Sequence, residues 1–143
     1  MWDISGKTAT ARLARARARI EVMPSSIAAV RAGTCPKGDP IETARIAAIQ
    51  AAKSTPQILP YCHPLPIDHI GIDFEVFDDG IEVNTSVRAM YKTGVEMEAL
   101  TAASVAVLTL WDMLKMIDPN LRISEIALVE KLGGKSDFKA EAT

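Results

Sequence analysis

His63 is the residue whose type and setting best suit acid–base chemistry. It lies in LPYCHPLP (59–66), where three prolines make a rigid, extended connector. A rigid backbone holds an imidazole in one place, which suits general acid–base catalysis or a hydrogen bond to a substrate. A lone histidine is more often a surface or capping residue, and Cys62 beside it is more often a small buried apolar residue than a nucleophile. Because adjacent Cys and His lack the spacing of metal ligands, we expect no metal site here.

Several basic residues suit an anion site. Lys37 lies in CPKGDP, just before a predicted helix, where a lysine, a flexible glycine and free backbone N–H groups can bind an anion; a solvated loop lysine is the alternative. Arg12 shares the parity of the apolar residues in a predicted strand, so it points toward the apolar face and needs a polar partner. Arg15, Arg17 and Arg19 fall on the opposite face. They predict a solvated surface or, alternatively, a phosphate-binding stripe or an interface.

One long apolar stretch, positions 92–115, separates two groups of charged residues. Glu98 lies near its start, and Asp112 and Lys115 lie near its end. A helix this apolar must be largely buried. Asp112 and Lys115 are three positions apart and share one face, as they would in an ordinary helical ion pair. Small polar residues continue the same stripe along the helix, which favours a contacted surface over solvent.

The length of this helix predicts a second copy of the chain. Glu98 precedes Asp112 by fourteen residues, or about 21 Å along a helix. One small-molecule pocket within a single chain hardly spans that distance. Two antiparallel copies would place the start of one helix beside the end of the other. We therefore hypothesise a two-fold dimer with composite sites.

Hydrophobic periodicity predicts an α+β fold. Strands are predicted over 8–23, 67–77, 80–90 and 122–129. Helices are predicted over 27–32, 40–54 and 94–117. The first helix should take its N-cap from residues 24–26. Asp39 suits the N-cap of the second helix, and Pro56 should end it by disfavouring helical geometry at Thr55. A glycine-rich tail, 131–136, follows the last strand, and its polar end should fray.

The order β-α-α-β-β-α-β predicts a ferredoxin-like antiparallel sheet, with helices packed on one face. We expect one domain over residues 1–143. A net charge of −2 argues against broad nucleic-acid or anionic-membrane binding. Two cysteines without a CxxC make no disulfide framework, and polar residues in the long helix oppose a membrane span. Because no signal peptide is recognisable, we expect a cytoplasmic protein.

Five segments carry a family resemblance: KGD (37–39), TARIAAIQAAK (43–53), LPYCHPLP (59–66), KTGVEMEALTAASVAVLTLWDMLK (92–115) and GGKS (133–136). From Asp3 to about Lys139 the chain resembles the cyclic pyranopterin monophosphate synthase family of molybdenum cofactor biosynthesis. The resemblance implies a phosphorus–oxygen lyase that converts 3′,8-cyclo-7,8-dihydroguanosine 5′-triphosphate, made by a partner radical enzyme, to cyclic pyranopterin monophosphate with release of pyrophosphate. It also implies a ferredoxin-like fold and hexamers, built as trimers of dimers with sites at the dimer interface.

The same resemblance implies roles for individual residues. It makes Asp112 the catalytic acidic residue, and Lys115 and Lys37 the essential lysines. The residues that it implies in substrate contact are Tyr61, Cys62, His63, Met97, Glu98 and Arg12. Tyr61 replaces the family's usual aliphatic residue, which bears on the pocket shape. The tail lacks the glycine that usually follows GGKS, which puts any role for Lys135 in doubt.

These residue types suit the implied chemistry. Rebuilding a purine as a pterin needs proton transfers at nitrogen and oxygen, and a lysine held by an aspartate can serve as general acid or base if its pKa is tuned. Closing the cyclic phosphate expels pyrophosphate, and Lys37, Lys115 and Arg12 could neutralise the developing charge. Which lysine is the acid and which binds phosphate stays open. No tightly bound cofactor is expected; Mg²⁺ can accompany the triphosphate, but no carboxylate cluster demands a tight metal site.

Two other functions are alternatives to this one. A non-catalytic nucleotide- or RNA-binding ferredoxin-like module is the first, but only seven residues are aromatic and no strand shows the paired aromatics used in base stacking. A structural domain whose apolar helix serves only oligomerisation is the second. It leaves the His63 loop and the charged helix ends unexplained.

Overall fold

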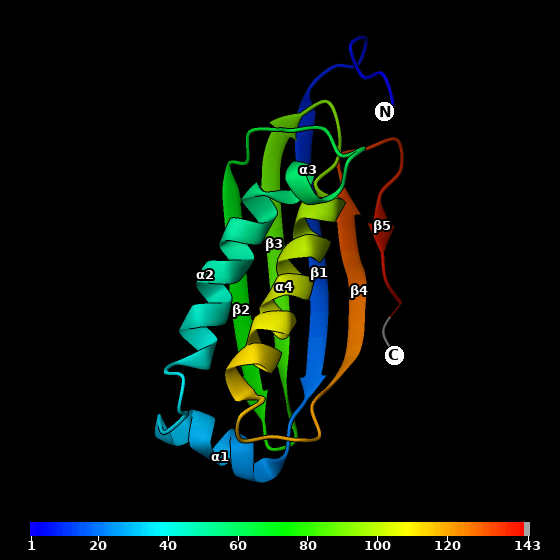
Figure 1. Ribbon diagram of the computed structural model, residues 1–143. Coiled ribbons are helices and arrows are strands. Elements are labelled where there is room, and N and C mark those ends of the chain that lie inside the picture. Colours follow the sequence, from blue (N-terminus) through cyan, green and yellow to red (C-terminus); the bar gives the residue numbers. More distant parts are fainter. Residues whose placement is uncertain (142–143) are drawn as a thin grey trace.

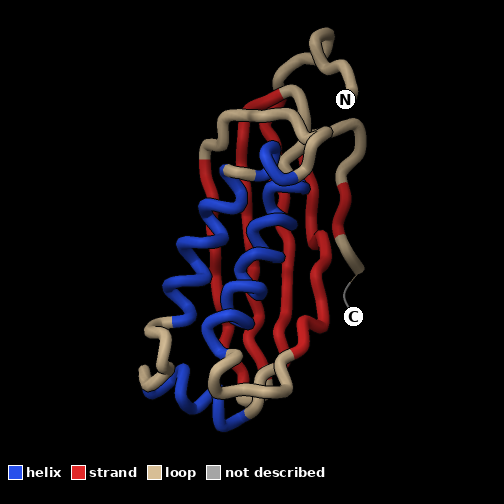
Figure 2. The backbone as a smooth tube through the Cα atoms, in the orientation of Figure 1, coloured by secondary structure: helices blue, strands red, loops and turns tan. Residues whose placement is uncertain are grey.

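The computed structural model describes residues 1–141 and shows an antiparallel sheet with its long helices on one face (Figures 1 and 2). The strands are β1 (Thr10–Glu21), β2 (His69–Phe77), β3 (Gly80–Tyr91), β4 (Arg122–Leu132) and β5 (Phe138–Lys139). The helices are α1 (Pro24–Ala32), α2 (Pro40–Lys53), α3 (Thr55–Ile58) and α4 (Glu96–Leu114). The strand order is β2-β3-β1-β4-β5. Its first four strands have the ferredoxin-like order, which confirms the predicted fold class.

Small residues bring the layers of the core close together. Every second residue of β1 faces the helices, and its alanines Ala14, Ala16 and Ala18 are fully buried. Alanines of α2 and α4 pack onto the same face; the fully buried ones are Ala44, Ala48, Ala52, Ala99, Ala102, Ala103 and Ala106. Because no large side chains separate them, α2 and α4 lie side by side on the same face of the sheet (Figure 1).

The central helix α4 is slightly shorter than the periodicity predicts. Val95 precedes it, and the N–H of Lys115 closes it with a 2.9 Å hydrogen bond to the carbonyl of Trp111. By length and composition it could cross a membrane, but half of its most apolar stretch is buried inside the fold. The core helix of a globular protein has the same length and composition. The buried half of α4 packs on the sheet and on α2, as a core helix does.

Of the four helices in residues 1–141, only α2 begins with a side-chain N-cap. The carboxylate of Asp39 accepts hydrogen bonds from the N–H groups of Ile41 and Glu42, which confirms the predicted N-cap of α2. The prediction that residues 24–26 supply the N-cap of α1 is wrong. Met23 takes that position and Pro24 begins the helix, because proline has no N–H to leave unpaired in a first turn.

Two further details correct the predicted elements. Pro56 does not keep Thr55 out of a helix: α2 ends at Lys53, and Pro56 lies in the first turn of α3, where proline is tolerated. The polar end of the tail does not fray where it begins, and its last two positions, 142–143, lie outside the described residues. It returns along the sheet edge as β5, with Phe138 opposite Lys131.

Candidate active site

Lys37, Asp112 and Lys115 meet at the C-terminal end of α4. The Nζ atom of Lys115 lies 3.0 Å from Oδ1 of Asp112, and Nζ of Lys37 lies 3.2 Å from the same oxygen. Lys37 also donates a 2.9 Å hydrogen bond to the backbone carbonyl of Asp112. We call these three residues the acid–lysine cluster. The structure thus brings together two predicted parts of the site that come from distant segments.

The two lysines act directly on the charge of Asp112. They lower the pKa of its carboxyl group below the ordinary value, first through the hydrogen bond from Lys115 and then through the one from Lys37. Asp112 is therefore ionised at neutral pH. Its side chain is 58% exposed and that of Lys115 is 56% exposed. A ligand can therefore reach the ammonium groups that Asp112 holds in place.

Local backbone geometry carries Lys37 to this position. Gly33 ends α1 in the left-handed conformation, with a φ of 71°, which turns the chain out of the helix. Gly38 has a φ of 107°, which turns it again directly before Asp39 caps α2. Lys37 lies between these two turns, at the end of the molecule where α4 ends.

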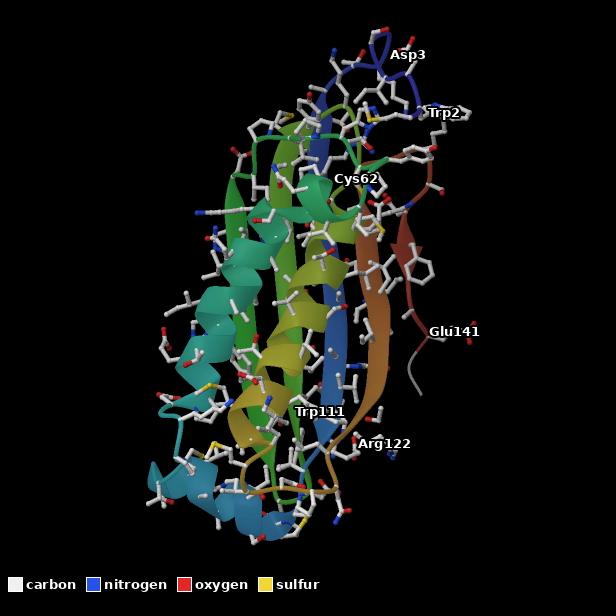
Figure 3. All side chains as sticks on the ribbon, in the orientation of Figure 1. Trp2, Asp3, Cys62, Trp111, Arg122 and Glu141 are labelled. Atoms are coloured by element: carbon white, nitrogen blue, oxygen red, sulfur yellow. The ribbon has the colours of Figure 1, made fainter. Side chains whose placement is uncertain are left out.

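The proline-rich loop lies at the opposite end of α4. Figure 3 shows this separation, with Cys62 near one end of the helix and Trp111 near the other. A cavity of about 110 Å³ opens here, and its lining residues are Tyr61, Cys62, His63, Thr93, Gly94, Glu96, Met97 and Glu98. We call it the loop cavity. It collects five of the six residues that the resemblance implies in substrate contact.

Burial changes the acid–base properties of two residues in the loop cavity. Glu98 is only 3% exposed, and burial raises the pKa of its carboxyl group to about 7, with the negative charge of Glu96 acting in the same direction. Glu98 is thus present in both protonation states near neutral pH. Burial likewise raises the pKa of the Cys62 thiol. Cys62 is therefore a neutral thiol and not a thiolate nucleophile.

Arg12, the sixth implied residue, lines a second cavity of about 210 Å³. Its lining residues are Lys7, Arg12, Thr93, Gly94, Glu96, Lys131, Leu132, Gly134, Lys135 and Ser136. Three residues, Thr93, Gly94 and Glu96, also line the loop cavity, so the two spaces adjoin. Four lining side chains are cationic, and we call this space the cationic cavity. Arg12 has the polar partners that its position requires, because it donates to the carbonyls of Tyr91 and Lys92.

Lys7, Glu96 and Lys131 were not predicted as site residues, and Lys135 had no assigned role. A local feature of the sequence could have indicated Glu96. Gly94, two positions earlier, has no Cβ, and the carboxylate of Glu96 occupies the space that a Cβ at Gly94 would need. Its Oε2 atom is buried and has no hydrogen-bond partner among residues 1–141. Lys131 and Lys135 lie only four positions apart, at the end of β4 and in the turn after it, but Lys7 comes from the N-terminal arm, and no spacing in the sequence connects it with the other two.

The turn that presents Lys135 is fixed despite the missing glycine. Gly133 has a φ of 95°, and a side chain there would collide with the carbonyl of Ala11. The carboxylate of Asp137 accepts a 3.1 Å hydrogen bond from the Gly133 N–H, and Thr10 donates to the Gly133 carbonyl at 2.8 Å. These contacts hold the tail against the start of β1, where Arg12 lies.

The arginines on the other face of β1 are paired with carboxylates. Arg17 makes two hydrogen bonds to Glu125, at 3.0 and 3.1 Å. Arg19 lies 3.0 Å from Glu21 and also contacts Asp79, while Arg15 is 3.7 Å from Glu130. Their charges are thus compensated within the chain. A phosphate-binding stripe on this face is not supported.

Anion-binding groups outnumber metal ligands in these sites. Within residues 1–141, no three His, Cys, Asp or Glu side chains are grouped so that they could hold a metal ion. Lysine and arginine side chains instead face the cationic cavity and the acid–lysine cluster. These groups suit phosphate oxygens and proton transfer.

Comparisons with known proteins agree with this chemistry. A family model described as the MoaC family matches residues 1–134. The chain is 48% identical to the cyclic pyranopterin monophosphate synthase of Streptomyces coelicolor, over 95% of this chain and 80% of that protein. It is 49% identical to the synthase of Novosphingobium aromaticivorans (95% and 87% covered) and 47% identical to that of Desulfitobacterium hafniense (95% and 84% covered).

Proposed function

The chain belongs to the MoaC family, and from this we propose that it is a cyclic pyranopterin monophosphate synthase of molybdenum cofactor biosynthesis. Its substrate is 3′,8-cyclo-7,8-dihydroguanosine 5′-triphosphate, supplied by an upstream radical enzyme, and pyrophosphate is its second product. The observation that supports this most strongly is the acid–lysine cluster. Exposed ion pairs contribute little to stability. An exposed aspartate that orients two lysines instead suits a proton-transferring site beside a phosphate ester.

The two cavities suit different parts of this substrate. The cationic cavity presents Lys7, Arg12, Lys131 and Lys135, which can bind several phosphate oxygens. The loop cavity presents His63 and Glu98, which can exchange protons with ring nitrogens and oxygens. Because the cavities adjoin, one molecule with a triphosphate and a purine-derived ring can occupy both. Mg²⁺ can accompany the triphosphate as part of the substrate.

The acid–lysine cluster cannot reach these cavities within one chain. Glu98 and Asp112 are separated by about 21 Å of helix. An exposed stripe runs between them along α4, with Met97, Leu108 and Trp111 as its large apolar side chains. Exposed apolar side chains aligned on one helix face are typical of a protein–protein interface, and tryptophan and methionine are enriched there.

A second copy packed antiparallel on this stripe completes the site. A two-fold axis near the middle of α4 would bring the acid–lysine cluster of one copy beside the loop cavity of the other. Each dimer then holds two composite sites. Three such dimers would make the hexamer that the family resemblance implies. A cytoplasmic location accords with both cysteines being free.

An RNA-binding module fits the structure less well. Ferredoxin-like RNA binders stack bases on aromatic side chains of the two central strands. Here β1 contains no aromatic residue, and β3 contains only Tyr91. The open sheet face instead carries the paired arginines of β1.

The direct test is turnover of the cyclised intermediate. Purified protein is incubated with 3′,8-cyclo-7,8-dihydroguanosine 5′-triphosphate, and released pyrophosphate is measured together with pterin fluorescence after oxidation. Equal molar amounts of pyrophosphate and pterin are expected. A folded, oligomeric protein that forms neither product would contradict the proposal. If that protein retained tight RNA binding, the binding module would be favoured instead.

A further inference from the structure

A third cavity lies behind the proline-rich loop and touches the loop cavity at one residue only. Its volume is about 250 Å³, and its lining residues are Ala52, Lys53, Pro56, Gln57, Pro64, Leu65, Ile67 and Glu98. We call it the rear cavity. Of these residues, only Glu98 also lines the loop cavity. Glu98 therefore borders both a front space and a rear space.

Glu98 is an unusual residue to find in that place. It is 3% exposed, and no ion pair of the described chain, residues 1–141, includes it. A buried acid without a cationic partner destabilises a fold when it ionises. Such a group is retained more readily where its proton is used, which makes Glu98 a candidate for proton transfer.

From these features we propose that Glu98 exchanges protons with solvent through the rear cavity while the substrate fills the loop cavity. The inference rests on the proposed function, and it assigns Glu98 a step that substrate contact alone does not include. A bound substrate closes the front side of Glu98 to water. A proton that Glu98 receives during the ring rearrangement then needs another exit, and the rear cavity supplies one.

The rear cavity has the properties of such an exit. Its volume is several times the roughly 30 Å³ that one water molecule occupies in the liquid. Lys53 and Gln57 are exposed, so the cavity meets solvent at their side of the rim. Apolar residues such as Leu65 and Ile67 also line it. A short file of water between polar ends can carry a proton from a buried carboxyl group to the surface.

The proposed step is balanced as a simple proton transfer. The Glu98 carboxylate accepts a proton from a nitrogen or oxygen of the substrate and becomes a neutral acid. It then gives that proton to a water molecule in the rear cavity, which restores the carboxylate and releases a hydronium ion to solvent. The reverse sequence delivers a proton to the substrate. No bond to carbon or phosphorus changes at Glu98, and no oxidation is involved.

The charged and titratable neighbours of Glu98 come from three elements. Glu96 lies on the same helix and opposes ionisation, as does burial. Cys62 and His63 face the loop cavity from the proline-rich loop, and Lys53 lines the rear cavity from the end of α2. The raised pKa, about 7, leaves both forms of Glu98 populated at neutral pH, which a group that passes protons both ways requires.

Chemical rescue tests the route as well as the residue. Glu98→Ala removes the carboxyl group, and formate is added as a small replacement acid at saturating substrate. We expect kcat to fall by about 100-fold and formate to restore it at least tenfold. A Gln57→Trp substitution, which places a large side chain at the rim of the rear cavity, should abolish the rescue. The matched change Gln50→Trp, on the exposed face of α2, should leave the rescue intact.

Three results would overturn the proposal. Rescue that survives Gln57→Trp would mean that formate enters elsewhere, and a folded Glu98→Ala variant without any rescue would remove the acid role. Glu98→Gln preserves the shape and serves if Glu98→Ala fails to fold. The pH profile of its kcat should lose the inflection near pH 7. The third contrary result would be a Glu98→Gln variant with the rate and the pH profile of the wild type. In each case wild-type turnover shows that the proposed function itself stands.

Discussion

Lys37 and Asp112 are 75 positions apart in the sequence, yet the Nζ atom of Lys37 lies 2.9 Å from the carbonyl oxygen of Asp112 and 3.2 Å from its carboxylate. The contact joins the loop before α2 to the last turn of α4. It also gives Asp112 a second ammonium group beside that of Lys115. The arrangement is therefore a three-residue unit. Removing its central carboxylate should release Lys115 and leave Lys37 with only its hydrogen bond to the backbone carbonyl of Asp112.

Asp112→Asn should lower kcat by at least about 100-fold, because an amide neither holds two ammonium groups nor tunes them for proton transfer. Its melting temperature should change by less than about 4 °C, since exposed ion pairs contribute little to stability. Steady-state kinetics and thermal unfolding measure the two effects. Asp78→Asn is the matched control, because Asp78 forms an exposed ion pair with Arg31. A control as inactive as Asp112→Asn would refute a specific role for the acid–lysine cluster.

Lys135→Ala should raise KM for the triphosphate substrate by about tenfold and change kcat less, because a phosphate contact in the cationic cavity acts mainly in binding. The effect should shrink at high ionic strength, where screening weakens the contact. Lys139→Ala, an exposed lysine of β5 that lines none of the three cavities, should leave KM unchanged. Equal KM values for both variants would exclude Lys135 from substrate binding.

Glu98→Gln should stabilise the protein at pH 8 more than at pH 5. In the unfolded chain the pKa of Glu98 is near its ordinary 4.5, whereas in the folded chain it is about 7. Between these values the folded state holds a proton that the unfolded state has lost, so stability falls as pH rises through this window. Glutamine never ionises and avoids this loss, which amounts to about 1–3 kcal/mol at pH 8.

Thermal unfolding at the two pH values checks this sign. The exposed Glu75→Gln, on β2, serves as the control and should show no such difference. An equal or opposite shift in Glu98→Gln would contradict the raised pKa and, with it, the part of the proton-exchange proposal that depends on two protonation states at neutral pH.

Ala48→Leu should destabilise the fold by about 1–3 kcal/mol, because Ala48 is fully buried in the layer of small residues between α2, α4 and the sheet. Ala28→Leu, on the exposed face of α1, adds the same side chain without a packing conflict. Chemical denaturation compares the two variants. A tolerated Ala48→Leu would show that the helices do not depend on close approach.

Local patterns were sufficient to predict the elements that carry the site. Alternation in β1, the N-cap at Asp39 and the apolar run of α4 each depend on neighbours within a few positions. The ferredoxin-like fold class was predictable because a hairpin and two long helices leave few ways to cover one face of a sheet. The pairing of Lys37 with Asp112 could not be read from spacing, since it depends on how two loops meet after the fold forms.

Features that depend on tertiary contacts escaped the sequence analysis. The short strand β5 exists because Thr10 and Asp137 hold the turn at Gly133, and neither contact has a local signature. The cationic cavity combines side chains from the N-terminal arm, β1, β4 and the tail. The raised pKa of Glu98 depends on the burial of its side chain. The apolar pattern of α4 does not predict that a residue in the first turn of this helix is buried.

The composite site is tested most directly by mixing two inactive variants. Asp112→Asn removes the acid–lysine cluster, and His63→Ala removes a residue of the loop cavity. If each site combines the two ends of α4 from different copies, a mixed dimer holds one intact site and one doubly defective site. Random mixing makes half of the dimers mixed, so co-expression should restore about one quarter of wild-type activity. Activity that stays at the level of the separate variants, in mixed oligomers verified by affinity tags, would contradict a site shared between two copies.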